Sequence, residues 1–323
     1  MLIKLIRSPI TWVVALLALG GLNFLAYRHA YAMLNFRQAG ERTPPPEALT
    51  RWQKLKILLN GIAIPKPQNH TTPASLNLPF EVHHITIDEN ITLEAWHMPH
   101  PRPKGIVVMF HGYAAAKSGM LPEAQAFYKL GYSTFLVDFR GSGGSSESQT
   151  SLGFYEAEAV TAAVAYARQI FAKQPLILYG QSMGAAAILR AVSVYGVKAD
   201  ALIIEAVFDR TLSTVQNRFA AIGWPAFPAA QLLIFWGGVQ LGYNGFSHNP
   251  ADYATTVVCP TLMLHGADDP RATLRQAQAV FQNLSGPKQF EIFAGVKHES
   301  YLAAQPERWK QTVSQFLKQR LQP

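Results

Sequence analysis

The chain has 323 residues, of which 49% are hydrophobic and 15% charged, and it contains a single cysteine, Cys259. A composition this apolar, without a glycine period or a heptad pattern, excludes a collagen-like chain, a coiled coil and a disordered chain. One cysteine also excludes an internal disulfide framework. The length leaves room for a large buried core.

The formal net charge of +8 is unevenly distributed along the chain. Residues 1–60 carry eight basic and two acidic side chains, whereas the rest of the chain carries 20 basic and 18 acidic ones. A nucleic-acid-binding protein usually concentrates its basic residues on its folded domain. We therefore expect the N-terminal end to meet a membrane surface, and we expect no nucleic-acid partner.

The first predicted element is an apolar helix near the N-terminus. Residues 10–26 contain no charged side chain, and as a helix they would extend about 26 Å, close to a hydrocarbon core of roughly 30 Å. Lys4 and Arg7 precede this run, and Arg28 follows it. We expect residues 1–40 to form a retained single-pass membrane anchor. The alternatives are a signal peptide, because residues 30–32 read Ala-Tyr-Ala, and a buried or interfacial helix.

The orientation of this anchor is predicted from its flanking charges. A short basic tail that includes Lys4 and Arg7 favours an N-terminus inside the cytoplasm. The catalytic domain is then expected on the extracytoplasmic side.

Residues 41–80 are predicted to be a proline-rich linker. Pro44, Pro45 and Pro46 break the preceding helix. Residues 47–62 then have the apolar spacing of a short amphipathic helix. This helix is expected either to lie on the membrane surface or to pack on the following domain.

From residue 81 onward, short β-branched runs alternate with helical ones. Strands are predicted at residues 81–88, 91–98, 106–110, 133–138, 176–179, 201–205, 257–264 and 289–293, and helices at residues 121–130, 152–172, 183–194, 274–283 and 301–321. The first two strands alternate polar and apolar residues, whereas the later ones are apolar throughout, as in parallel strands covered on both faces. Residues 81–323 are therefore predicted to form one α/β domain, with a mostly parallel eight-stranded sheet and helices on both faces.

Residues 208–256 interrupt this alternation with a stretch rich in Phe, Trp, Leu and Gly, including a predicted helix at residues 229–239. The stretch is too long for an ordinary connection, so we expect a small cap insertion over the sheet. It serves either as a lid or acyl-binding wall, or as one extra core helix.

A nucleophile is predicted where residues 180–184 read Gly-Gln-Ser-Met-Gly. The motif follows an apolar strand and opens a helix of small residues, which is the setting of a nucleophile elbow. The turn is sharp, so Gly180 and Gly184 must lack bulk beside Ser182. A helix start also directs its N–H groups at developing negative charge.

A serine needs a base and an acid that orients the base. Among the ten histidines, His298 is the one that follows the last predicted strand. Residues 265–269, after another strand, read His-Gly-Ala-Asp-Asp, and Asp269 has the expected spacing. Asp268 and Glu205 remain alternatives for the acid.

The oxyanion of an acyl-transfer reaction needs backbone donors. The N–H of Met183, directly after the nucleophile, is one candidate. The second is the N–H of Tyr113 in a loop that starts with His111 and Gly112, where the glycine lets the backbone approach closely. The Tyr113 side chain either lines the entrance or packs.

The order of these parts, from oxyanion loop to serine, acid and histidine, resembles that of the α/β-hydrolase superfamily. Residues 138–145 read Asp-Phe-Arg-Gly-Ser-Gly-Gly-Ser, which is similar to a loop of its lipase-like and serine-aminopeptidase-like branches, and Arg140 is expected to pair a carboxylate there. With its N-terminal segment, the chain resembles membrane-associated bacterial serine hydrolases of the monoacylglycerol-lipase/serine-aminopeptidase-like group. The resemblance covers residues 81–321.

The sequence predicts a serine hydrolase that cleaves a small-molecule ester or lipid through an acyl-enzyme, with no cofactor. A peptidase or an acyltransferase with the same triad is the alternative within enzymes, and a non-catalytic membrane-tethered binding protein is the alternative outside them. No metal is expected, because the four histidines near the first two strands fit no standard site; they are His83, His84, His97 and His100.

Overall fold

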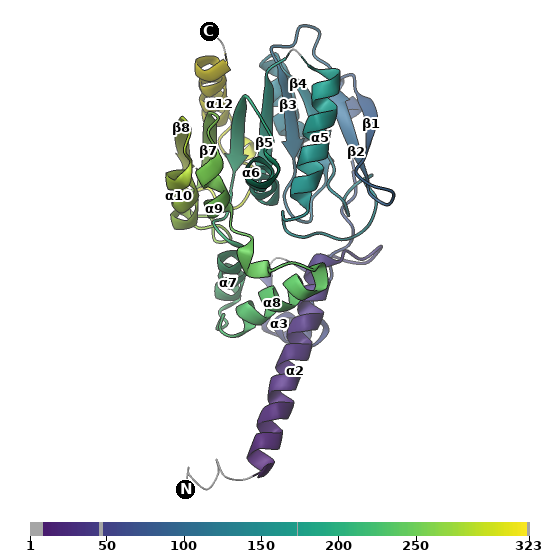
Figure 1. The fold of residues 1–323 in the computed structure, drawn as a ribbon, viewed down its shortest axis with the longest axis vertical. Coiled ribbons are helices and arrows are strands. Elements are labelled where there is room, and N and C mark those ends of the chain that lie inside the picture. The colour runs from purple at the N-terminus through teal and green to yellow at the C-terminus, as the bar shows by residue number, and fades with distance from the viewer. Residues whose placement is uncertain (1–8, 45–47, 173, 322–323) are drawn as a thin grey trace.

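A computed structural model describes residues 9–44, 48–172 and 174–321 of the chain (Figure 1). Lys4, Arg7, Pro45 and Pro46, which enter the predictions for the anchor and linker, lie outside these residues. The first described element is α2 (Pro9–Leu34), which extends further than the predicted apolar run. It is followed by α3 (Arg51–Asn60), within the helix predicted at residues 47–62.

The centre of the fold is an eight-stranded sheet. Its strands are β1 (Glu81–Thr86), β2 (Thr92–Met98), β3 (Ile106–Phe110), β4 (Ser133–Val137), β5 (Leu176–Gln181), β6 (Ala201–Glu205), β7 (Thr261–Gly266) and β8 (Lys288–Phe293). Their order in space is β1-β2-β4-β3-β5-β6-β7-β8. The β1–β2 and β2–β4 pairs are antiparallel, and the pairs from β4–β3 to β7–β8 are parallel. The predicted mostly parallel sheet is therefore confirmed.

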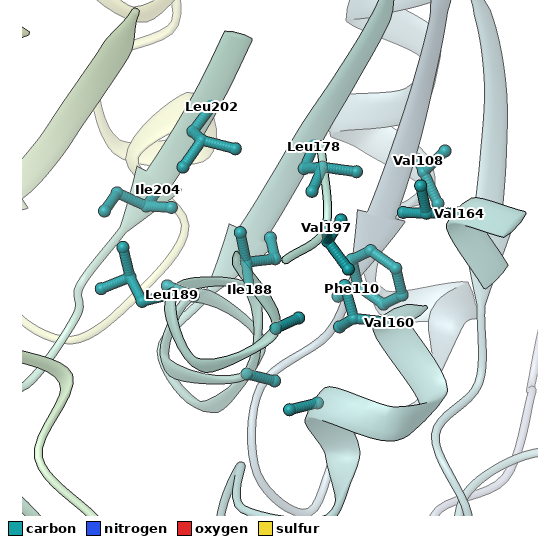
Figure 2. Close-up of a cluster of buried hydrophobic side chains, with 14 of the residues drawn as sticks. Val108, Phe110, Val160, Val164, Leu178, Ile188, Leu189, Val197, Leu202 and Ile204 are labelled. Atoms are coloured by element: carbon teal, nitrogen blue, oxygen red, sulfur yellow. The ribbon is translucent and has the colours of Figure 1, made fainter. Parts of the chain in front are cut away.

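Helices cover both faces of this sheet, because successive side chains of a buried strand point to opposite sides. Ile106, Val108 and Phe110 of β3 face one core, while Val107 and Met109 face the other. The helices α5 (Glu156–Ile170), α6 (Met183–Tyr195) and α10 (Leu274–Asn283) close the first core. Figure 2 shows side chains of α5 and α6 that meet those of β3, β5 and β6. The helices α4 (Leu121–Lys129) and α12 (Pro306–Leu321) close the second core.

Two parts of the predicted helical pattern differ in the structure. The predicted helix at residues 301–321 is split into α11 (Tyr301–Ala304) and α12, because Pro306 has no N–H to continue the first helix. The cap region contains α8 (Ala229–Leu241), close to the predicted helix, and also α7 (Thr211–Ile222) and the short α9 (Pro250–Tyr253), which were not predicted.

The N-terminal helix α2 projects from the fold at the end where the cap lies (Figure 1). Ala26, Ala30 and Leu34, one turn apart, are buried, whereas the N-terminal half of α2 is exposed. By its length and composition, α2 is long and apolar enough to cross a membrane. The helix α3 contacts both α7 and α2: the Lys54 ammonium donates to the carbonyl of Ile222 at the end of α7, and the His29 ring of α2 bonds to the carbonyl of Leu58 in α3.

Candidate active site

Ser182 lies in the sharp turn between β5 and α6. Its φ is 52° and its ψ is −107°, a conformation that costs free energy for any residue with a side chain and that concentrates at functional sites. Its N–H donates to the carbonyl of Glu205 over 2.8 Å, and its carbonyl accepts from the N–H of Ala186 over 3.0 Å. The turn is therefore held by β6 on one side and by the first turn of α6 on the other.

The two glycines of the motif are required by close backbone approach. A Cβ on Gly184 would lie 2.3 Å from the carbonyl oxygen of Phe110. A Cβ on Gly180 would lie 2.7 Å from the backbone nitrogen of Ala185. Neither contact is tolerated by real Cβ atoms, so any side chain here pushes β3 or α6 away from the serine.

Replacing Gly184 with alanine is expected to lower the free energy of unfolding by about 1–3 kcal/mol, the usual cost of overpacking a closed site. Gly119→Ala is the matched control, because a Cβ there has no neighbouring atom within 4 Å. Urea denaturation of both variants measures the difference. Equal midpoints for Gly184→Ala and Gly119→Ala would contradict the predicted crowding.

The structure brings the three predicted triad residues into one chain of hydrogen bonds. His298 Nε2 lies 3.1 Å from Ser182 Oγ, and His298 Nδ1 lies 2.6 Å from Asp269 Oδ2. A carboxylate only accepts hydrogen bonds, so the imidazole carries its proton on Nδ1 and presents the Nε2 lone pair to the serine hydroxyl. This is the tautomer that a general base needs.

The two alternative acids lie elsewhere. Asp268 is exposed at the surface, whereas Asp269 is buried with an exposed fraction of 4%. Glu205 is also buried, but its Oε1 accepts from the indole N–H of Trp309 over 2.6 Å. Asp269 is thus the one of the three that contacts His298.

Asp269 is held in its charged form. Burial raises the pKa of its carboxyl, but the hydrogen bond from His298 and those from the N–H groups of Ala272 and Arg271 outweigh burial and lower the pKa below its usual value. The backbone of the loop after β7 therefore holds the carboxylate in position beside the imidazole.

The predicted oxyanion loop follows β3 and lies against the nucleophile turn. A Cβ on Gly112 would be 3.5 Å from the Gln181 carbonyl oxygen and 3.7 Å from Ser182 Cβ, so the loop backbone passes close to the serine. Met183 is the first residue of α6, and its side chain is buried. Both predicted donors, Tyr113 and Met183, thus belong to segments that adjoin Ser182.

His111 has a structural place in this loop. Its Nε2 accepts from the N–H of Phe139 over 3.1 Å, so its Nδ1 carries the proton and donates to the carbonyl of Gly112 over 2.8 Å. Burial lowers the pKa of His111 and keeps the ring neutral. The ring therefore fixes the backbone of the glycine next to the serine.

The Tyr113 side chain connects the loop to the end of α2. Its hydroxyl donates to the carbonyl of Met33 over 2.6 Å, and its ring packs against Phe36 at 6.0 Å between centroids. Burial raises the pKa of this phenol to about 12. Both alternatives weighed for the side chain apply, because it packs and also lines the cavity beside the serine.

A cavity of about 590 Å³ opens at Ser182 and His298. Apolar side chains from the segment predicted as a linker form one wall, and Leu49, Ile62 and Ile64 belong to it. Phe208, at the start of the cap region, lies on another wall. The segment at residues 41–80 is thus part of the site, which its proline-rich sequence did not indicate.

Three arginines also line the cavity, and sequence reasoning missed them. Arg42 follows α2, Arg218 lies on α7 and Arg271 lies next to the triad acid. The Arg42 guanidinium donates to the carbonyl of Ala114 over 3.3 Å, and the Arg218 guanidinium lies over the Tyr113 ring. No local sequence pattern marks these residues, because they meet through tertiary packing.

A buried acidic pair, Glu205 and Glu123, lies behind the nucleophile turn. Ser300 Oγ donates to Glu123 over 2.6 Å. Burial, together with the neighbouring Glu123 charge, raises the pKa of Glu205 from 4.5 to about 8. Glu205 is therefore protonated in the folded protein at neutral pH.

This pair predicts a pH-dependent stability. Between pH 4.5 and about 8 the folded state keeps a proton on Glu205 that the unfolded state releases, so this group destabilises the fold progressively as pH rises. Glu205→Gln is expected to unfold at an increasingly higher temperature than the wild type across this interval. Glu307→Gln, at an exposed residue, is the control. A Glu205→Gln curve parallel to the wild type would contradict the prediction.

The loop at residues 138–145 is held by a buried ion pair that was not predicted. The Lys117 ammonium contacts Asp138 and Glu94, and it lies 4.3 Å from the centre of the Trp96 ring. Arg140 pairs with the carboxylate of Glu147, as expected for this loop. The buried lysine thus ties the loop to the segment that follows the oxyanion loop.

Of the four histidines weighed as metal ligands, the structure groups two. His83 and His97 lie with Glu81 so that one ligand atom from each falls within 4.8 Å of the others. His84 is exposed, and His100 instead packs against Tyr128. In this group His97 Nδ1 lies 3.3 Å and His83 Nε2 lies 3.4 Å from the same Glu81 carboxylate oxygen, and His83 Nδ1 lies 3.0 Å from the hydroxyl of Tyr166.

Comparisons with known proteins give one family match and several relatives. Residues 101–252 match a family described as serine aminopeptidase, S33. The chain is 26% identical over 232 residues to the uncharacterised protein YqkD of Bacillus subtilis, which covers 70% of this chain and 75% of that one. It is 28% identical over 144 residues to an uncharacterised membrane protein of Saccharomyces cerevisiae, which covers 44% of this chain and 50% of the relative.

Among solved structures, an esterase of Pyrococcus furiosus is similar, with a TM-score of 0.66 and 21% sequence identity over 80% of this chain and 98% of that chain. This likeness, together with the strand order, confirms the predicted fold class. The family match supports a hydrolase.

Proposed function

We propose that the chain is an α/β-hydrolase, as its fold and its match to the serine aminopeptidase, S33 family over residues 101–252 support, and that it is a serine hydrolase that cleaves carboxylic esters. The observation that carries the proposal is the hydrogen-bonded series from Ser182 Oγ through His298 to Asp269, at 3.1 and 2.6 Å, beside a cavity of about 590 Å³. A serine hydroxyl is a weak nucleophile that an adjacent base of this kind activates.

In the proposed reaction, His298 Nε2 takes the hydroxyl proton as Ser182 Oγ attacks the acyl carbonyl. The N–H groups of Tyr113 and Met183 hold the oxyanion. His298 then gives its proton to the leaving alkoxide, which departs as the alcohol and leaves the acyl group on Ser182. Water, deprotonated by the same imidazole, releases the acid and restores the serine.

The cavity supports an apolar acyl group as the bound part of the substrate. Leu49, Ile62, Ile64 and Phe208 give the walls carbon surface close to Ser182. An alkyl chain placed there gains roughly 0.8 kcal/mol for each buried methylene. A lipid or an acylglycerol-like ester fits this lining better than a short, water-soluble ester.

We also propose that α2 anchors the enzyme in a membrane as a single span, with the catalytic domain on the extracytoplasmic side. The described helix has 26 residues, which extend about 39 Å and exceed a hydrocarbon core of roughly 30 Å. Exposed apolar side chains such as Leu16 and Leu17 support the membrane anchoring. The yeast relative described as a membrane protein supports the anchoring as well.

Labelling with a fluorophosphonate probe tests the catalytic proposal. The wild type is expected to form a covalent adduct, and Ser182→Ala is expected to form none. A panel of esters with acyl chains of increasing length then tests the substrate, with faster cleavage of longer chains expected. An unlabelled wild type would refute the hydrolase mechanism, and equal labelling of the alanine variant would refute Ser182 as the nucleophile.

A further inference from the structure

Residues 219–247 form a long stretch of the cap without a single Asp, Glu, Lys, Arg or His. In the whole chain, by contrast, 15% of residues are charged. The helix α8 occupies the middle of this stretch. An exposed helix of a protein surrounded by water carries polar and charged residues on its outer face. The sequence of α8 is therefore that of a helix with apolar neighbours on every side.

Two sides of α8 are covered within the chain. On one side it packs against α2, where the Trp236 indole N–H donates to Asn23 Oδ1 over 3.1 Å and the Gln240 amide donates to the carbonyl of Tyr27 over 2.9 Å. On a second side, Ala230 and Ile234 form a buried cluster with α7. The third side has no cover among the residues that the structure describes.

This third side is apolar. Phe235 and Val239, one turn apart, are 49% and 53% exposed. Phe227 precedes the helix with an exposed fraction of 77%, and Phe246 follows it with 41%. We name Phe235 and Val239 the outer face of α8, and the exposed Phe227 and Phe246 flank the helix along the chain. Exposed large apolar side chains of this kind mark an interaction surface.

We propose that the outer face of α8 is seated in the lipid bilayer beside α2. The inference rests on the proposed anchoring by α2, beside which α8 packs (Figure 1). At a rise of about 1.5 Å per residue, Asn23 lies about 21 Å and Tyr27 about 27 Å from Pro9 along α2. If Pro9 marks one boundary of a core of roughly 30 Å, the α8 contacts lie just inside the other boundary.

The exposed residues of the neighbouring helix α3 are of the types found where a protein meets lipid headgroups. Trp52 is 81% exposed and Leu55 is 46% exposed, and the cationic Arg51 and Lys56 are exposed on the same short helix. Tryptophan and basic residues are enriched where protein meets lipid headgroups. Because the His29 ring joins α2 to a carbonyl of α3 over 3.0 Å, this interface lies at the level of residue 29, directly beyond the α8 contacts.

Docking of α8 also brings the cavity to the bilayer. Phe219 of α7 packs in the cluster with α8, while Asn217 and Ala221 of the same helix line the cavity. The helix α7 therefore lies between α8 and the cavity beside Ser182. With α8 seated in the bilayer, the cavity would lie near the lipid surface.

The test uses the full chain with a fluorescent thiol label at single cysteines, in a Cys259→Ser background. Val239→Cys probes the outer face of α8. Val194→Cys is the matched control, because it is also a helical valine with a similar exposure of 50%, near the end of α6 that lies away from Ser182. Leu16→Cys probes the proposed span. Each protein is placed in vesicles of phosphatidylcholine and phosphatidylglycerol that contain a spin-labelled lipid quencher.

We expect the quencher to reduce emission at position 239 several-fold more than at position 194, and by an amount similar to position 16. Quenching at position 16 but not at 239 would overturn the docking of α8 and leave the anchor intact. Quenching at neither position would overturn the anchor and the docking together. A label at 239 that is shielded from water but not quenched would show that a second copy of the chain covers α8, which also overturns the proposal.

A folding control keeps the test decisive. Fluorophosphonate labelling reports whether each cysteine variant retains its fold, because positions 239 and 194 do not line the cavity. If Val239→Cys does not react with the fluorophosphonate, Phe235→Cys replaces it, since Phe235 shares the outer face and is 49% exposed against 53% for Val239. The same outcomes then apply at position 235.

Discussion

Replacing His298 with alanine is expected to lower kcat for ester hydrolysis by about five to six orders of magnitude. The imidazole is the group within hydrogen-bond distance of Ser182 Oγ, at 3.1 Å, and it is required twice, as the base for the serine and as the acid for the leaving group. KM is expected to change little, because the ring contributes to the transition state rather than to the apolar walls. Steady-state kinetics on a chromogenic ester measures both parameters.

His84→Ala is the matched control for this variant. His84 is on β1, its side chain is 61% exposed, and it lies 3.9 Å from Glu94 without contacting the site. Its kcat should stay within a few-fold of the wild type. A His298→Ala enzyme that retained wild-type kcat would remove the imidazole from the mechanism, whatever the outcome for the control.

Replacing Asp269 with asparagine is expected to reduce kcat by about four orders of magnitude. The amide keeps the size of the carboxylate but offers an N–H where His298 now finds an acceptor at 2.6 Å. The ring is then driven toward the tautomer with its proton on Nε2, which no longer accepts from the serine. The stabilisation of the imidazolium that forms during attack is lost as well.

The neighbouring residue supplies a close control for this assignment. Asp268→Asn removes the same charge at an exposed position one residue away. Its kcat is expected to remain near the wild-type value, so the pair separates a local charge effect from orientation of the histidine. A larger loss in Asp268→Asn than in Asp269→Asn would reverse the assignment of the acid.

The sequence was sufficient to predict the fold because its signals are local. The strands from β3 to β7 are short, largely apolar runs, and the alternation of strands with helices predicts that they run parallel. The helix α7 also carried a local signal, since Leu212, Val215 and Phe219 recur at helical spacing. It was missed because the cap was treated as a single interruption of the strand–helix pattern.

The candidate triad could be predicted from the sequence for a similar reason. Ser182, Asp269 and His298 each follow a strand of the same sheet, and the carboxyl ends of parallel strands meet at one edge. The residues that line the cavity could not be predicted in this way. Ile62 and Arg42 reach the site because the segment after α2 folds back over the loop at Tyr113, a contact that depends on the whole tertiary structure.

The hydrogen bond from Tyr113 to the carbonyl of Met33 has a practical consequence for removing the proposed anchor. A chain shortened to begin after residue 40 would lose that acceptor and also Phe36, which packs on the Tyr113 ring. The phenol would then be left without this partner in the loop beside Ser182. A shortened chain that preserves the loop at Tyr113 would therefore have to keep the last turn of α2 and Phe36.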